Sequence, residues 1–351
     1  MTPPPTPTRT PVPAPAPAPA PAPPSDAAAP RPLSRTRRAL RALAIASCVP
    51  YLAIKIAWIF GSSVGIPDGS PLLDHRVTMV VANVATALMD AAVIVLALLL
   101  TQAWGRRVRP WLLALPMWLA TGLLAPIMLG FPLQLLVGAL GSTSRGAADT
   151  GREPFLDAWV FGVVYGGFIL QGLTLGTLFV LYARDRWAHL WRGRVGDLPT
   201  SASQPARRTA AVTAAVLALI PAALNLMWAF GSTAGLNEGR IADRTSDFSV
   251  TQAEYALFAL CAAAGALMLA FRIGRALPLH VPLALAWVGS GATACWGGWL
   301  VLGSLVAGDD VVNRPTQVMN LSYAVQMIVG TLVVALVASF LAERAAAKRR
   351  A

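Results

Sequence analysis

Charged residues are scarce in this chain. They make up 13% of it, where a soluble domain carries about 25%, and hydrophobic residues make up 56%. The apolar residues fall in long runs, and a helix of about 20 such residues crosses a hydrocarbon core. This composition excludes an ordinary soluble fold. It predicts an all-α fold, a polytopic transmembrane helix bundle in contact with the lipid bilayer.

Lysine, cysteine and histidine are almost absent. Two Lys stand against 26 Arg, the three Cys have no metal-binding spacing, and no His has a ligand partner at i+3 or i+4. Phosphate-binding loops, zinc-protease motifs and the Gly-x-Ser-x-Gly pattern are also missing. We therefore expect no metal, no cofactor and no enzymatic activity. The net charge of +12 comes mainly from arginines in the predicted loops, so we expect no nucleic-acid partner.

Eight apolar stretches predict eight membrane spans. They cover residues 40–60, 77–103, 111–139, 156–182, 209–230, 252–271, 281–306 and 317–342. The segments between them alternate in charge, with twenty Arg and Lys on one side and six on the other. Positively charged loops favour the cytoplasmic side. The pattern predicts a multi-pass protein of the cytoplasmic membrane, with both termini in the cytoplasm.

The first 32 residues have a composition of their own. They contain an alternating run of Ala and Pro, which favours extended polyproline II and cannot bury a core. We expect a disordered, semi-rigid cytoplasmic tail. A second interpretation is a docking segment for a protein partner.

A short motif occurs twice at an offset of 170 residues. It contains Trp58 and Gly61 in the first copy and Trp228 and Gly231 in the second. Each copy lies at the end of the first of four predicted spans. Because an even number of spans makes both halves enter from the same face of the membrane, the two predicted repeats are parallel. The predicted divisions are a tail (1–38), a first four-span repeat (39–183), a cytoplasmic basic linker (184–208), a second repeat (209–342) and a basic cytoplasmic C-terminus (343–351).

Two charged side chains are expected well inside the spans, Lys55 and Asp90. An ionisable side chain at the centre of a membrane helix costs about 3 kcal/mol on insertion scales, so it usually faces the interior of a bundle. Asn83 shares a helix face with Asp90 and lies near the expected depth of Lys55. Together these residues form a candidate polar site for a proton, an ion or a small polar ligand. The alternatives are a buried structural ion pair, or a Lys55 that snorkels outward and an Asp90 that is held neutral.

The pattern Lys-x-x-Trp-x-x-Gly at Lys55, Trp58 and Gly61 resembles uncharacterised multi-pass integral membrane proteins of actinobacteria. The resemblance covers residues 40–342 and implies the same eight-span plan. The second repeat departs from it, with Asn225 in the Lys position. The resemblance implies no activity.

Three functions are compatible with this sequence. We expect transport or binding of a small molecule or ion between the two helical repeats. The alternative is a non-enzymatic membrane scaffold or accessory subunit of a membrane complex, with the tail and the Arg-rich loops contacting a partner. A third, an intramembrane lipid-modifying enzyme, would need a polar cavity that opens to the bilayer.

Overall fold

The computed structural model describes most of the chain from Ser34 onward. Described are residues 34–68, 70, 73, 76–140, 156–199, 201, 203–242, 244–306 and 312–350. The predicted tail lies outside the described residues up to Leu33.

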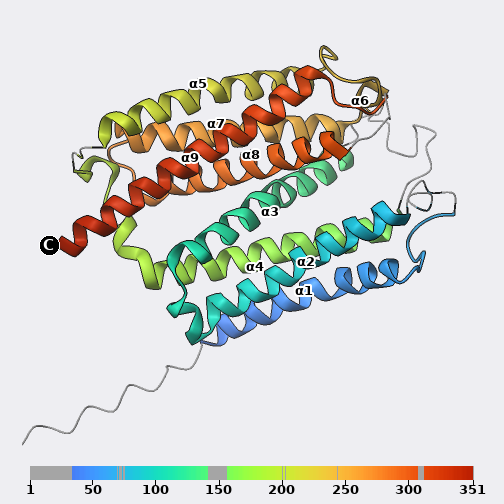
Figure 1. The fold of residues 1–351 in the computed structure, drawn as a ribbon, viewed down its shortest axis with the longest axis horizontal. Helices are drawn as coiled ribbons and strands as arrows, with labels where there is room; N and C mark the ends of the chain where they lie inside the picture. Colours follow the sequence, from blue (N-terminus) through green and yellow to red (C-terminus); the bar gives the residue numbers. More distant parts are fainter. Residues whose placement is uncertain are drawn as a thin grey trace, which may run out of the picture. The chain divides into compact units, whose positions relative to one another are not determined.

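Eight helices in this part of the chain are long and apolar enough to cross a membrane, which confirms the predicted all-α transmembrane bundle (Figure 1). They are α1 (Arg35–Ile59), α2 (Arg76–Thr101), α3 (Pro110–Ala139), α4 (Ala158–Trp191), α5 (Gln204–Ala229), α7 (Ser246–Phe271), α8 (His280–Val306) and α9 (Gln317–Arg350). Short helical segments in the connections are η1 (Ala103–Arg107), η3 (Val195–Asp197) and α6 (Glu238–Ala242).

Polar caps set where two of these helices begin. The Ser34 side chain accepts a hydrogen bond of 3.3 Å from the backbone N–H of Arg37 and starts α1. The Thr245 side chain accepts one of 3.2 Å from Phe248 and starts α7. Such caps satisfy N–H groups that have no partner in the first turn of a helix. As a result α7 begins before the predicted start of its span at residue 252.

The fourth helix is longer than its predicted span. It continues to Trp191, so the predicted basic linker of residues 184–208 begins as helix. In this extension, Arg186 donates hydrogen bonds to the carbonyl oxygens of Gly105 at 3.3 Å and Val108 at 2.9 Å. The end of α4 therefore holds the connection between α2 and α3 in place.

The helices pack in two groups that meet through α3. In the N-terminal half (α1–α4), α1 packs on α2 and α4, and in the C-terminal half (α5–α9), α5 packs on α7 and α9. From the N-terminal half, α3 also packs on α7 and α8 (Figure 1). A Cβ atom at Gly122 would lie only 2.3 Å from the carbonyl oxygen of Gly291, so the backbones of α3 and α8 nearly touch. Close approach at small residues is a common way for membrane helices to associate.

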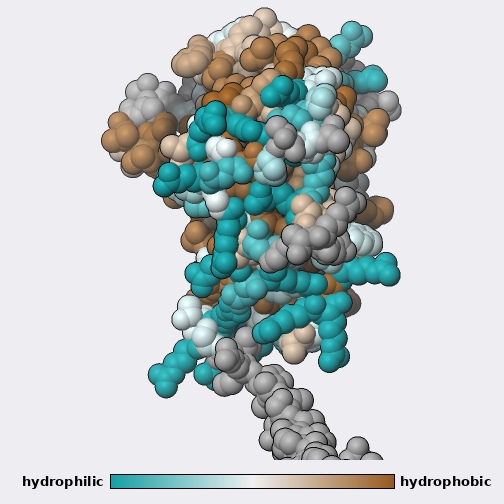
Figure 2. Space-filling view, turned by 90° about the vertical axis from the view of Figure 1, so that its left-hand side faces the viewer, coloured by the Kyte–Doolittle hydropathy of each residue, from teal (hydrophilic) through white to brown (hydrophobic). Residues whose placement is uncertain are grey.

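Charge is concentrated at one end of the bundle. Figure 2 looks onto the end at which α5 begins and α9 ends, and hydrophilic residues cover much of it. We call it the basic end; it carries Arg37, Arg192, Arg207 and Arg344. There, Arg37 pairs with Asp185 of α4 at 2.5 Å. The predicted orientation, with this end in the cytoplasm, stays a prediction.

Candidate functional site

Lys55 and Asp90 form an ion pair inside the N-terminal half. Lys55 lies one turn before the end of α1, and Asp90 lies in the middle of α2. The Nζ atom of Lys55 is 2.7 Å from Oδ2 of Asp90, and the two residues are 1% and 3% exposed. The structure therefore brings two of the three predicted site residues into direct contact.

Two more side chains complete this pair. Gln171 of α4 donates a hydrogen bond of 3.4 Å to Oδ1 of Asp90. The Nζ atom of Lys55 also lies 3.7 Å from the centre of the Tyr51 ring, in a cation–π contact. Both carboxylate oxygens of Asp90 thus have a partner. The sequence does not predict the role of Gln171, because its place beside Asp90 depends on how α4 packs against α2.

Asn83, the third predicted site residue, does not join this cluster. Its side chain donates a hydrogen bond of 2.9 Å to the carbonyl oxygen of Met79, one turn earlier in α2. The Lys55–Asp90 pair and its two partners come from α1, α2 and α4, so the cluster lies within the N-terminal half and not between the halves. The predicted role of these residues as an ion or solute site stays a prediction.

The C-terminal half leaves buried polar atoms without partners. At the position equivalent to Lys55 stands Asn225, which is 1% exposed and whose Nδ2 has no hydrogen-bond partner in the described chain. Six residues with such an atom are described, and all belong to this half: Arg207, Asn225, Glu254, Thr293, Asn320 and Arg344. A buried polar group without a partner costs about 1–3 kcal/mol. A ligand or water that completed these groups would therefore bind in the C-terminal half.

Glu254 corrects the prediction that only Lys55 and Asp90 are charged well inside the spans. It lies eight residues after Ser246, about 12 Å along α7 at 1.5 Å per residue. It is 5% exposed. A span that starts at residue 252 would place this acid at the membrane surface. The earlier start of α7 places it inside the bundle instead.

The Glu254 carboxyl faces α3, at the contact between the two halves. A Cβ atom at Gly130 of α3 would lie 2.5 Å from its Oε2, so the missing side chain leaves the space that the carboxyl fills. One turn along the same contact, Gln134 of α3 donates a hydrogen bond of 3.2 Å to the Thr251 hydroxyl. Among the described residues Glu254 has no ion pair, and its Oε1 accepts no hydrogen bond.

A cavity of about 220 Å³ lies beside this contact, between α5, α7, α8 and α9 at the end opposite the basic end. Its polar lining includes Arg240, Asp247, Thr251 and Tyr255. Gln134 of α3 contacts two residues of this lining, the Thr251 hydroxyl and the backbone oxygen of Asp247. The sequence does not predict this cavity, because its walls come from segments far apart in the chain.

The four residues of the predicted repeat signature build the same helix-ending turn twice. They are Trp58, Gly61, Trp228 and Gly231. Each Trp side chain donates to the carbonyl oxygen six residues later, that of Val64 at 2.8 Å and that of Ala234 at 2.9 Å. The two glycines have φ of +94° and +118°, which residues with a side chain rarely adopt. The signature therefore caps a helix. The wider prediction of two parallel four-span repeats stays a prediction.

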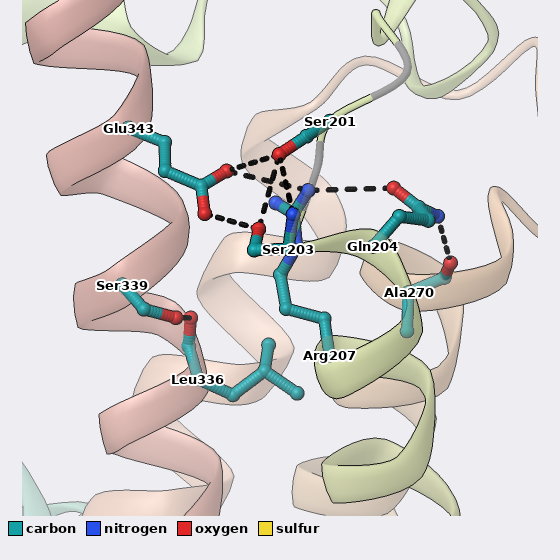
Figure 3. Close-up of polar contacts among 8 residues, drawn as sticks. All are labelled: Ser201, Ser203, Gln204, Arg207, Ala270, Leu336, Ser339 and Glu343. Carbon is teal, nitrogen blue, oxygen red and sulfur yellow. Dashed lines mark hydrogen bonds and ion pairs between the residues drawn. The ribbon is translucent and has the colours of Figure 1, made fainter.

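A polar cluster joins α5 to α9 at the basic end (Figure 3). Glu343 of α9 accepts hydrogen bonds from Ser203 and, at 2.9 Å, from Ser201. It also lies 3.4 Å from the Nη2 atom of Arg207. Gln204 continues the cluster to the last turn of α7. The sequence does not predict this ion pair, because Arg207 and Glu343 lie on distant segments. This cluster holds together the end of the C-terminal half that lies away from the cavity.

Comparison with known proteins assigns no family to this chain. No family model, no curated protein and no solved structure matches it. Within the described residues, no group of three or more His, Cys, Asp or Glu is placed to hold a metal ion. Function has to be inferred from the buried charges and the cavity.

Proposed function

We propose that this membrane protein binds, and moves across the bilayer, a small molecule or ion at the junction of its two halves. The observation that carries the proposal is Glu254, an unpaired carboxyl buried where α3 meets α7. Ionisable residues inside membrane spans commonly mark ion or substrate pathways.

The contrast between two buried acids supports this proposal. Both carboxylate oxygens of Asp90 have a hydrogen-bond partner, in Lys55 and Gln171. In the described N-terminal half, no buried side-chain nitrogen or oxygen atom lacks such a partner. In the other half, Glu254 and Asn225 each have a buried polar atom without a hydrogen-bond partner. Evolution tolerates such a cost most readily where a site needs it for function.

The size and charge of the cavity indicate what kind of solute fits. At about 220 Å³ it is smaller than the roughly 300–1,000 Å³ of pockets for drug-sized ligands. Its lining contains one cationic side chain, Arg240, and one anionic side chain, Asp247. No ion pair between these two is present in the described chain. A small ion or a small polar solute matches this lining.

Flux into proteoliposomes tests the proposal. Purified protein is reconstituted with a trapped pH dye, a proton gradient or a membrane potential is imposed, and the entry of protons or cations is followed. We expect flux above that of protein-free vesicles and a loss of at least about tenfold in Glu254→Gln, since among the described residues the change removes the one buried acid without an ion pair. Gly138→Ala is the matched control, because no atom lies within 4 Å of the added Cβ. No flux in the wild type, or full flux in Glu254→Gln, would contradict the proposal.

The same assay tests the predicted role of the Lys55–Asp90 pair. If Asp90→Asn folds and keeps full flux, Asp90 has no part in transport. The alternative is a scaffold or accessory subunit. It is favoured by the fact that both oxygens of Asp90 already have partners within the protein. Co-purification of a stoichiometric partner that is lost when residues 1–32 are removed would support that alternative.

A further inference from the structure

We propose that Glu254 is a reversible proton-binding site, opened to water through the cavity on the Tyr255 side of α7. This inference deepens the proposed function, on which it rests, by naming the ion. Its test below reads the carboxyl directly and does not depend on flux.

The surroundings of Glu254 favour a proton-carrying state. The residue is 5% exposed, and no cation of the described chain lies within ion-pair distance. An isolated ionised carboxylate costs far more to bury than a neutral carboxyl. Asp90, by contrast, has the Nζ atom of Lys55 at 2.7 Å. Of these two buried acids, only Asp90 therefore has a cationic side chain beside it.

The described side chains around Glu254 do not form a divalent-cation site. Hard cations such as Ca²⁺ take about six to eight oxygen ligands, and Mg²⁺ takes six. Glu254 faces the backbone of Gly130, and no cluster of three acidic, His or Cys side chains is present in the described chain. A proton needs no shell of ligands, so a single carboxyl suffices.

Tyr255 is the residue of the cavity lining that stands next to Glu254 in the chain. Tyr323 and Arg240 line the same cavity. Water that enters the cavity would reach Tyr255 first and the carboxyl next. Opening of the contact between α3 and α7 at Gly130 would then expose Oε1 and allow the proton to leave.

Few titratable groups surround the site. Those on α6 and α7, and on the helices that pack on α7 toward the cavity end, are Glu238, Arg240, Asp247, Tyr255, Cys261, Cys295 and Tyr323. From the described residues of α3 come only Gly130 and Gln134, which do not titrate. The charged residues of α5 and α9, Arg207 and Glu343 among them, lie at the basic end. Arg240 and Asp247 at the cavity are thus the charges that can modulate Glu254.

Labelling with dicyclohexylcarbodiimide tests the proposal. This apolar reagent enters membranes and reacts with a protonated carboxyl: the O–H adds across a C=N bond, and the adduct rearranges to a stable N-acylurea. Wild-type protein in nanodiscs is treated at several values between about pH 5 and about pH 9. Peptide mass spectrometry then locates the modified residue.

We expect Glu254 to be modified at least about tenfold faster than Asp90 at low pH, with a rate that falls as pH rises. Glu254→Gln should remove the label from its peptide. Gly130→Ala is the second variant: its Cβ would lie 2.5 Å from Oε2 and obstruct the carboxyl, so it should slow labelling of Glu254 without adding a label elsewhere.

Three outcomes would overturn the proposal: no label on Glu254, equal labelling of Asp90, or a rate independent of pH. Slower labelling of Glu254 when sodium ions are added at constant pH would assign the site to a metal cation instead. Labelling as expected in a protein that gives no flux would leave the proton site standing and remove the transport function. The converse, flux without labelling, would remove Glu254 as the proton site alone.

Discussion

Separating Lys55 from Asp90 should destabilise the protein strongly. Lys55→Met removes the 2.7 Å ion pair and the cation–π contact with Tyr51, and it leaves Asp90 buried with Gln171 as its remaining partner. Breaking a buried pair by removing one partner costs about 3–5 kcal/mol, because a charge stays behind without compensation. Asp90→Asn should cost near the lower end of this range, since the Asn carbonyl oxygen can still accept a hydrogen bond from the ammonium.

The double variant Lys55→Met with Asp90→Asn should recover most of this loss. Replacing both partners of a buried pair with uncharged side chains is often neutral or stabilising, so we expect it within about 1 kcal/mol of the wild type. Thermal unfolding in nanodiscs measures all variants, with Asn83→Leu as a control that removes a hydrogen bond within α2. A coupled pair would be refuted if each single variant lost less than about 1 kcal/mol of unfolding free energy, or if the loss in the double variant equalled the sum of the two single losses. A rise in stability in Asp90→Asn would instead mark Asp90 as a charge kept for function.

Three further changes have clear expected outcomes in the same unfolding assay. Gly122→Val should cost about 2 kcal/mol or more, since its Cβ would lie 2.3 Å from the backbone oxygen of Gly291, whereas Gly138→Val should be tolerated in a place with no neighbour within 4 Å. Gly231→Ala should cost about 1 kcal/mol, because φ is +118°, and an unchanged midpoint would argue against this turn. Glu343→Gln should cost about 1 kcal/mol, as it weakens two serine hydrogen bonds and a half-exposed ion pair, and raised salt should reduce that difference.

The spans were predictable because length and hydropathy act locally. Each of the eight predicted stretches overlaps one observed helix. The Lys55–Asp90 contact was also within reach, since both residues are too costly to expose to lipid and both stand in neighbouring spans. The sequence could not predict that Tyr51 and Gln171 are partners of this pair. Their positions depend on how α1 and α4 are rotated about their axes.

Glu254 was missed for a local reason that could have been noticed. Thr245 precedes Ser246 and Asp247, and such a cap starts a helix, so the sixth span could have been extended by two turns. The Glu343 cluster and the cavity are different. Both join segments more than 60 residues apart, and no periodicity in one segment reports on the other.

The seam between α3 and α8 has a consequence for the order of assembly during synthesis. Trp118 donates its indole N–H to the Ser290 hydroxyl at 3.0 Å, across 172 residues of chain. At about 5–20 residues per second, the ribosome needs about 10–30 s to make the second residue after the first. During that interval α3 is already in the membrane with its indole N–H and the bare backbone of Gly122 facing lipid or another partner. The first four helices therefore cannot form all their contacts until the seventh span, α8, has been made.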